Sequence, residues 1–295
     1  MSSSNTSSYS YAARQVTIYL GIPTLLGGLF GEIMNILVFL SLKTFRENSC
    51  AFYLTIMSFV NIGQLLTSLL FQLMIRGFYI DWTQTSVFYC KFRIFILQFF
   101  CALTSFTCMC LATIDQFLAT CSHIRWQRFS NIKIAYRLII LSLLFWILHG
   151  IPLLIYQDLV LTSSITNDYT CTSINKQYQS YLMYGFSLIL VSSLPIFITT
   201  IFGLLAYQNV KQLSHRAVPL VRRETDKQLT IMVLVQNTLN FCFILPFIIV
   251  TILNLTLTYN RDSINYARLQ LARSITVTCF YLYYAVSQKC KDIDC

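Results

Sequence analysis

Charged side chains are scarce in this 295-residue sequence: Asp, Glu, Lys and Arg together make up 11 % of it. A soluble domain usually carries about a quarter charged residues. Hydrophobic residues, in contrast, make up 56 % of the chain. A soluble protein of this length could not hide so much apolar surface from water. The composition therefore excludes a soluble domain and favours a protein surrounded by the lipid bilayer.

Histidine is also rare, and the three histidines, His123, His149 and His215, lie in different segments. None has a second histidine at the spacing of a helical zinc site, so no metal site is predicted. The sequence has no Gly-x-Ser-x-Gly nucleophile motif, no phosphate-binding loop and no pair of acidic residues inside an apolar segment. We therefore do not expect an enzyme, and no cofactor is predicted.

Acidic residues are fewer than basic ones, 11 against 21, which gives a net charge of +10. The basic residues lie in short clusters between apolar segments. This distribution is typical of cytoplasmic loops beside anionic lipid, and not of a face that binds nucleic acid. We therefore expect the lipid bilayer as a partner and no nucleic acid.

The 11 cysteines do not follow the pattern of a disulfide-rich secreted domain. Cysteine inside an apolar run behaves as a small hydrophobic residue, and five cysteines lie in such runs: Cys101, Cys108, Cys110, Cys242 and Cys279. Only Cys90 and Cys171 lie where an oxidising compartment could join them.

Seven segments each supply the roughly 20 apolar residues that a spanning helix needs. They cover residues 17–42, 51–75, 88–121, 136–157, 181–207, 228–258 and 266–286. The seventh is interrupted by Arg268 and Arg273. The sequence thus predicts an all-α, integral membrane bundle of seven transmembrane helices over residues 17–287. An extracellular tail over residues 1–16 would precede it, and a short cytoplasmic tail over residues 288–295 would follow.

The basic residues also predict the orientation. More than half of them fall in segments that are cytoplasmic if the N-terminus lies outside, including clusters within residues 125–137 and 211–227. Positive charge favours the cytoplasmic side, so we expect an extracellular N-terminus and a cytoplasmic C-terminus. Asn5 begins an Asn-x-Ser/Thr sequon and would then be a glycosylation site.

Among the charged residues inside predicted spans, two are the most informative: Glu32 in the first span and Arg273 in the outer half of the seventh. A charge at the bilayer centre costs about 2.5–3.5 kcal/mol on insertion scales, so such residues normally face the bundle interior and find partners. Two interpretations stay open. The two side chains can neutralise each other structurally, or Arg273 can meet an anionic ligand.

Short motifs in order along the seven segments resemble those of the rhodopsin-like family of G-protein-coupled receptors, and the resemblance covers nearly the whole chain. Asn-Ile-Leu-Val at 35–38 is similar to the first-span motif that contains Asn35. Leu-Ala-Thr-Ile-Asp-Gln-Phe at 111–117 is similar to the segment that ends in Asp-Arg-Tyr. The remaining matches are single residues: Trp82 and Cys90 before the third span, Cys171 in the second extracellular loop, Trp146, Pro195 and Pro246.

The sequence also departs from the family pattern at several positions. Gln116 stands where the family has the arginine that engages the G protein. Asn61 replaces the second-span aspartate, and Ile244 stands in place of the sixth-span tryptophan. The seventh-span Asn-Pro-x-x-Tyr motif retains only Tyr283.

The resemblance implies a plasma-membrane receptor that binds a small molecule or a peptide and signals through a heterotrimeric G protein. It pairs Cys90 with Cys171 in a disulfide. It also places the G-protein-facing surface on 115–128 and 211–227, with Asp226 as the acidic partner of the missing arginine. Because Gln116 carries no charge, we expect the inactive state to lack that charge pair and its restraint. The residues assigned to this surface are Asp115, Gln116, Phe117, Asp226 and Lys227.

Two positions bear on the ligand. By the family's spacing, Gln98 stands where amine receptors carry their aspartate, and Arg273 stands where opsins carry the lysine that binds retinal. An ammonium ligand would find no counter-ion at Gln98, and arginine cannot form the retinal Schiff base. We therefore predict an anionic ligand, or a short peptide with an acidic end, that reaches Arg273 and Gln98 beneath Trp82 and Tyr266.

Two other functions remain as alternatives. One is a protein of the same fold that does not signal, such as a decoy or a trafficking partner. The other is a transporter or channel, which would need a path of polar residues through the membrane. The candidates for such a path show no evident clustering in the sequence: Glu32, Asn35, Asn61, Gln98, Asp115, Asn240 and Arg273.

Overall fold

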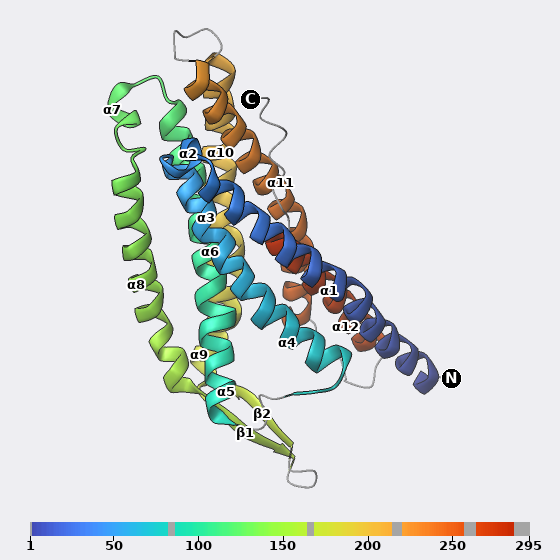
Figure 1. The fold of residues 1–295 in the computed structure, drawn as a ribbon. Helices are drawn as coiled ribbons and strands as arrows, with labels where there is room; N and C mark the ends of the chain where they lie inside the picture. The colour runs from blue at the N-terminus through green and yellow to red at the C-terminus, as the bar shows by residue number, and fades with distance from the viewer. Residues whose placement is uncertain (1, 82–85, 164–167, 214–219, 257–263, 286–295) are drawn as a thin grey trace.

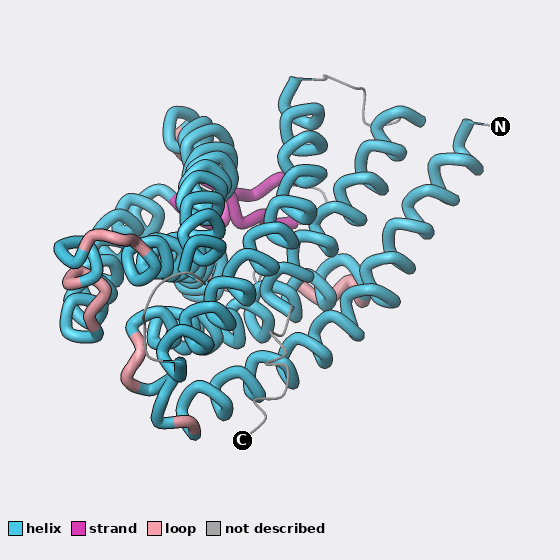
Figure 2. The backbone as a smooth tube through the Cα atoms, turned by 90° about the horizontal axis from the view of Figure 1, so that it is seen from above, coloured by secondary structure: helices cyan, strands magenta, loops and turns pink. Residues whose placement is uncertain are grey.

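The computed structural model describes residues 2–81, 86–163, 168–213, 220–256 and 264–285. Within this described part the chain is almost entirely helical, and its one sheet is a two-stranded hairpin (Figures 1 and 2). The hairpin marks one end of the helix bundle, which we call the hairpin end. The short helix α7 (Ile124–Gln127) marks the other, which we call the α7 end (Figure 1).

The first two spans are joined by a tight connection at the α7 end. Helix α1 (Ser2–Ser41) is followed by the single turn α2 (Lys43–Arg46). The Asn48 side chain then accepts hydrogen bonds from the backbone N–H groups of Cys50 and Ala51, and so caps the next helix. The second span is one continuous helix with two π-helical stretches: α3 (Ser49–Gln64), η1 (Leu65–Leu69), α4 (Leu70–Gln72) and η2 (Leu73–Gly77).

The third span begins at the hairpin end and the fourth returns to it. The third consists of α5 (Val87–Phe92), η4 (Arg93–Phe100) and α6 (Cys101–Thr120). After α7, the Asn131 side chain accepts a hydrogen bond from the Lys133 N–H and caps α8 (Ile132–Tyr156), the fourth span.

The hairpin follows α8 directly. Strand β1 (Gln157–Ser163) pairs antiparallel with β2 (Asp168–Ser173), with Gln157 opposite Ser173 and Leu159 opposite Cys171. The fifth span then runs through α9 (Lys176–Ser180), η5 (Tyr181–Ser193) and α10 (Leu194–Leu213).

The last two spans are α11 (Leu220–Thr256), which contains Pro246, and α12 (Ile264–Ala285). All seven predicted helices are therefore present, with ends that differ from the expected ones by between one residue and about fifteen. By length and composition alone, six helical segments among the described residues qualify as membrane spans. The shorter and more polar α12 is the predicted seventh span, and it completes the bundle by packing against α1 and α11.

The largest difference from the expected boundaries is at the N-terminus. Residues 2–16, expected as a tail, continue α1 as a helix. The Arg14 side chain donates a 2.7 Å hydrogen bond to the Gly77 carbonyl and lies over the Tyr79 ring. Arg268 on α12 lies over the Tyr9 ring, with 5.7 Å between guanidinium carbon and ring centroid. These contacts hold the polar extension against the outer ends of two other spans.

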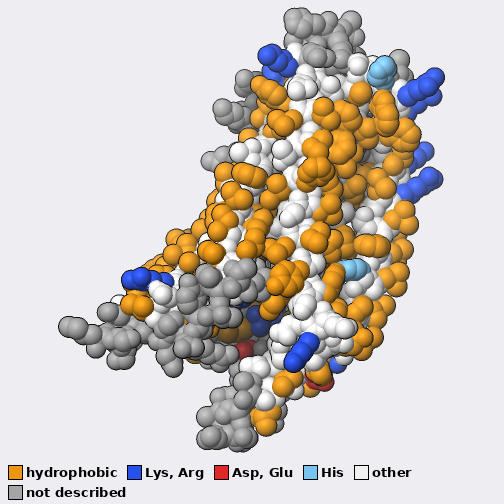
Figure 3. Space-filling model, turned by 180° about the vertical axis from the view of Figure 1, so that it is seen from behind, with side chains coloured by type: hydrophobic (Ala, Val, Ile, Leu, Met, Phe, Trp, Pro, Cys, Tyr) orange, Lys and Arg blue, Asp and Glu red, His pale blue; other side chains and the backbone are white. Residues whose placement is uncertain are grey.

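The interior and the exterior of the bundle differ in the way a lipid environment requires. Helix α6 is the most enclosed span, and α8 is the least enclosed, with only four buried residues. Large apolar side chains of α8 point outward, among them Leu141, Leu148 and Ile155. Apolar side chains cover most of the visible face in Figure 3, as expected for a surface that contacts acyl chains.

Candidate ligand cavity and signalling core

A network of buried polar side chains links four spans in the middle of the bundle. The Glu32 carboxylate on α1 accepts hydrogen bonds from the Asn61 amide at 2.8 Å and from the Asn35 amide at 3.3 Å. The Asn61 carbonyl oxygen accepts a 2.6 Å bond from the Ser105 hydroxyl, which lies 3.5 Å from the Tyr283 hydroxyl. Each of these residues is at least 90 % buried. Three residues that the sequence left scattered, Glu32, Asn35 and Asn61, therefore meet in one cluster.

Glu32 does not pair with Arg273, so this sequence-based alternative is wrong. Tyr9 contacts Arg268, and a Cβ built on Gly28 would lie 2.7 Å from that of Ala285, so α1 and α12 run parallel in nearly constant register. At 1.5 Å of rise per residue, Arg273 lies about 25 Å along the bundle from Glu32. Asparagine amides, and not a guanidinium, satisfy the buried carboxylate.

At the α7 end, the third span contacts both the second and the fifth. Asp115 accepts a 2.7 Å hydrogen bond from Ser49, at the start of α3. The Phe117 ring packs edge-on against Phe202 of the fifth span at 5.5 Å. Lys227 is exposed on α11. The side chain of Asp226 lies outside the described residues.

Gln116 takes part in a restraint that the sequence did not predict. Its side-chain carbonyl accepts a 2.9 Å hydrogen bond from the Thr230 hydroxyl on α11, and both residues are 1 % exposed. One turn deeper from Gln116, the Asn237 amide donates to the Thr113 hydroxyl at 3.2 Å. Neutral hydrogen bonds therefore join the third and sixth spans where the family has its charge pair, and the absence of that charge pair stays a prediction.

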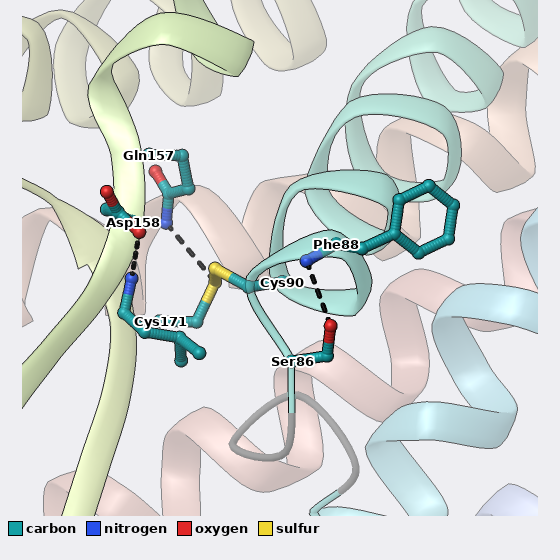
Figure 4. Close-up of a disulfide and its surroundings, with 7 residues drawn as sticks. Ser86, Phe88, Cys90, Gln157, Asp158 and Cys171 are labelled. Carbon is teal, nitrogen blue, oxygen red and sulfur yellow. Dashed lines mark hydrogen bonds between the residues drawn. A yellow bond between two sulfur atoms is a disulfide. The ribbon is translucent and has the colours of Figure 1, made fainter.

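At the hairpin end, a disulfide between Cys90 and Cys171 ties the third span to strand β2 (Figure 4). This confirms the predicted pairing. The Ser86 hydroxyl accepts a hydrogen bond from the Phe88 N–H and caps α5 just before the cysteine. The Gln157 amide lies 3.6 Å from the Cys171 sulfur, so the first residue of β1 also contacts the crosslink (Figure 4).

A cavity of about 250 Å³ opens between the second, third, fifth, sixth and seventh spans near the hairpin end. Its floor includes Tyr281, whose hydroxyl is 2.7 Å from that of Ser68. Its walls carry three arginines, Arg76, Arg93 and Arg273.

The four residues predicted to bind the ligand have different positions. Arg273 lines the cavity. Tyr266 lies on α12 but is not among the described residues that line it. Trp82 and the side chain of Gln98 lie outside the described residues, as does the side chain of Asn5.

Two arginines of the cavity, Arg76 and Arg93, were not among the residues predicted from the sequence to bind the ligand. A signal was present: the second span carries polar residues at every fourth position, Gln64, Ser68, Gln72 and Arg76, and all four line the cavity. This spacing places them on one face of a helix. The described residues contain no group of three or more His, Cys, Asp or Glu side chains that could hold a metal ion.

Membrane-length helices, a buried polar network and a basic cavity open towards one end define a multi-pass helical membrane protein. The model of the 7 transmembrane receptor (rhodopsin family) matches residues 31–287, and the chain belongs to this family. This confirms the resemblance seen in the motifs. A comparison with curated proteins found no match.

Proposed function

We propose that the chain is a plasma-membrane receptor that binds a small anionic ligand in the cavity at the hairpin end and signals through a heterotrimeric G protein at the α7 end. In this orientation the N-terminus is extracellular. The observation that carries the proposal is the cavity itself, because it places three guanidinium groups between five spans of a receptor-family bundle. Cavities between helices are a common location for ligand sites in bundles.

The α7 end supports the signalling part of the proposal. The bond between Gln116 and Thr230 joins the third and sixth spans directly. A ligand that favours separation of these spans has to overcome this neutral bond, which is worth about 0.5–1.5 kcal/mol. A shift of that size changes a two-state equilibrium by a few-fold to about tenfold.

A second candidate function has one observation in its favour. Gln116 stands in place of the family's arginine and is held by Thr230, so the charge that engages a G protein is missing. A receptor-like protein that captures ligand or escorts a partner without signalling would have this arrangement.

The test is nucleotide exchange on purified heterotrimeric G proteins by the full chain in lipid nanodiscs. We expect low exchange by the wild type without ligand and higher exchange by Thr230→Val, because this variant removes the restraint and keeps Gln116. Thr238→Val is the matched control, since the Thr238 hydroxyl bonds only to the Leu234 carbonyl of its own helix. Gln116→Arg restores the family's charge at the G-protein-facing end.

If Thr230→Val and Gln116→Arg both fold and neither raises exchange on any G-protein class, the signalling function is wrong. The non-signalling candidate then takes its place.

A further inference from the structure

We propose that the cavity selects a small organic dianion whose two acid groups are separated, and that Arg76, Arg93 and Arg273 hold these groups from three different spans. This inference rests on the proposed function, because it specifies the ligand class of the same cavity.

The three arginines form a cluster with an excess of positive charge. Arg76 comes from η2, Arg93 from η4 and Arg273 from α12, and all three line one cavity. Because one cavity of about 250 Å³ is lined by all three side chains, their positive charges are gathered at the same site. Among the described residues, no carboxylate lies within ion-pair distance of any of the three arginines. The ion pair that the described part of the chain does contain, Lys43–Glu47, lies at the α7 end, away from the cavity.

The hydrogen-bond and ring contacts of Arg76 and Arg93 are with neutral side chains, so these contacts do not neutralise the positive charges. Arg76 donates a long, 3.4 Å hydrogen bond to the Ser274 hydroxyl. Arg93 lies over the Phe71 ring, 5.6 Å from its centroid. Among the described residues, Asp81 is the carboxylate whose charge attracts Arg93. Within the described part of the chain, three guanidinium groups against one carboxylate leave an excess of two positive charges.

This excess sets the charge of the ligand. Arginine remains protonated in proteins, so the cluster cannot neutralise itself by losing a proton. A guanidinium presents paired donors that match a carboxylate or phosphate. Because the guanidinium groups come from three spans and not from one helix face, two acid groups at different positions satisfy them better than one compact group.

Two glutamines of the second span point to further polar contacts with the same ligand. Gln64 is 2 % exposed, lines the cavity, and its side-chain carbonyl oxygen has no hydrogen-bond partner among the described residues. The Gln72 amide nitrogen also lines the cavity without a partner there. An unpaired buried polar atom is costly, so a ligand that carries a hydroxyl or amine donor beside its acid groups would satisfy the Gln64 oxygen.

The volume of the cavity limits the ligand's size. At about 250 Å³ it lies just below the roughly 300–1,000 Å³ that is usual for drug-sized ligands. A small diacid fits this space, whereas a peptide could place only one end in it.

The proposal can be tested with the full chain in nanodiscs of uncharged lipid at constant ionic strength. The probes are the straight-chain dicarboxylates from malonate to adipate, the monomethyl ester of each, and methyl phosphate as a compact dianion. Binding is measured by the ligand-dependent shift in Tm. We expect at least one dicarboxylate to bind about tenfold or more tightly than its own monomethyl ester, because the ester loses a charge-assisted contact at nearly the same size.

Variants then locate the contact. Arg76→Gln, Arg93→Gln and Arg273→Gln are each expected to remove most of the preference for the diacid over its ester. Arg268→Gln is the matched control, because Arg268 is an exposed arginine of the same helix as Arg273 and contacts Tyr9 outside the cavity. The comparison of diacid with ester in the wild type tests the proposal even if a variant does not fold.

Three results would each overturn the proposal. Diacids and their esters could bind equally, methyl phosphate could bind more tightly than every diacid, or no probe could bind to folded protein with an intact Cys90–Cys171 bond. Nucleotide exchange separates this inference from the proposed function. If a diacid binds but no nucleotide exchange on a G protein follows, only the signalling function is contradicted. If a monoanion drives nucleotide exchange and diacids are not preferred over their esters, only the proposal of a dianionic ligand is contradicted.

Discussion

At the scale of single residues, a neutral amide has taken the place of a charge at two central positions. Asn61 bridges Glu32 and Ser105 with both ends of its amide, and the carboxylate of this network comes from the first span instead of the second. Gln116 accepts from Thr230 where the family has an arginine. In both cases the side chain lies in the bundle core and a hydrogen bond across spans satisfies its oxygen atom.

The first prediction concerns Asn61. Asn61→Leu removes the donor to Glu32 and the acceptor for Ser105, so it leaves two buried polar groups with fewer partners. We expect a loss of about 2 kcal/mol or more in stability, since each unsatisfied buried group costs about 1–3 kcal/mol. The measurement is the apparent Tm of the purified protein in nanodiscs.

Thr55→Val is the control for this variant, because Thr55 is buried in the same helix and bonds only to the Ala51 carbonyl of that helix. An equal loss of Tm in both variants would contradict a bridging role for Asn61.

At the scale of elements, close helix packing and one crosslink position the spans around the cavity. Helix α1 approaches α12 closely at Gly28, where an added Cβ would lie 2.9 Å from the Ala285 backbone. The disulfide joins the helix that carries Arg93 to the hairpin that follows the fourth span. Loss of either feature is therefore expected to disturb the hairpin end.

The second prediction uses two adjacent glycines of α1. Gly28→Ala forces α1 away from α12 and is expected to cost about 1–3 kcal/mol, as overpacking usually does. Gly27→Ala meets no atom within 4 Å and is expected to stabilise the protein by up to about 1 kcal/mol, because alanine favours the helix over glycine. The measurement is the Tm of each variant in thermal unfolding. Equal Tm values would show that the two helices do not pack closely at Gly28.

The third prediction concerns the disulfide. Cys90→Ser is expected to lower stability by about 2–4 kcal/mol, the usual value for a crosslink that constrains the unfolded chain. Cys242→Ser, at an exposed free cysteine, serves as the control and should leave the Tm unchanged. Non-reducing peptide mapping of the wild type should recover the Cys90–Cys171 pair, and a free thiol at either position would rule the crosslink out.

At the scale of the whole molecule, the two ends of the bundle differ in chemistry. The hairpin end carries a basic cavity and a disulfide, whereas the α7 end carries exposed basic residues such as Arg125 and Lys227. A disulfide belongs on the extracellular or lumenal side, and basic loops belong on the cytoplasmic side. Both arguments support the same orientation.

The fourth prediction tests this orientation through the sequon at 5–7. With the N-terminus outside, Asn5→Gln and Ser7→Ala should each remove one glycan-sized step from the mass of the expressed protein. Thr6→Ala should keep it, because the sequon tolerates nearly any middle residue. Glycosidase treatment followed by mass analysis measures the step.

An N-terminal epitope tag provides a second readout of orientation. It should be stained by antibody on intact cells, and staining only after permeabilisation would reverse the orientation.

The sequence by itself determined the seven helices and the disulfide. Their signals are local or chemical: apolar runs of membrane length, and two cysteines outside those runs where the resemblance pairs them. The predicted helix ends were less accurate, as at residues 2–16, which were expected to precede the first helix. Polar residues can extend a helix when tertiary contacts hold them, as the hydrogen bond from Arg14 to Gly77 does here.

Only the tertiary structure decided which polar residues meet. Glu32 and Arg273 both lie in predicted spans, yet the register of the two parallel helices separates them. Glu32 accepts a hydrogen bond from Asn61 instead. Arg76, Arg93 and Arg273 come together from three spans, at sequence distances that no local pattern encodes. Such encounters depend on the rotation and register of each helix in the bundle, which packing between small and large side chains decides.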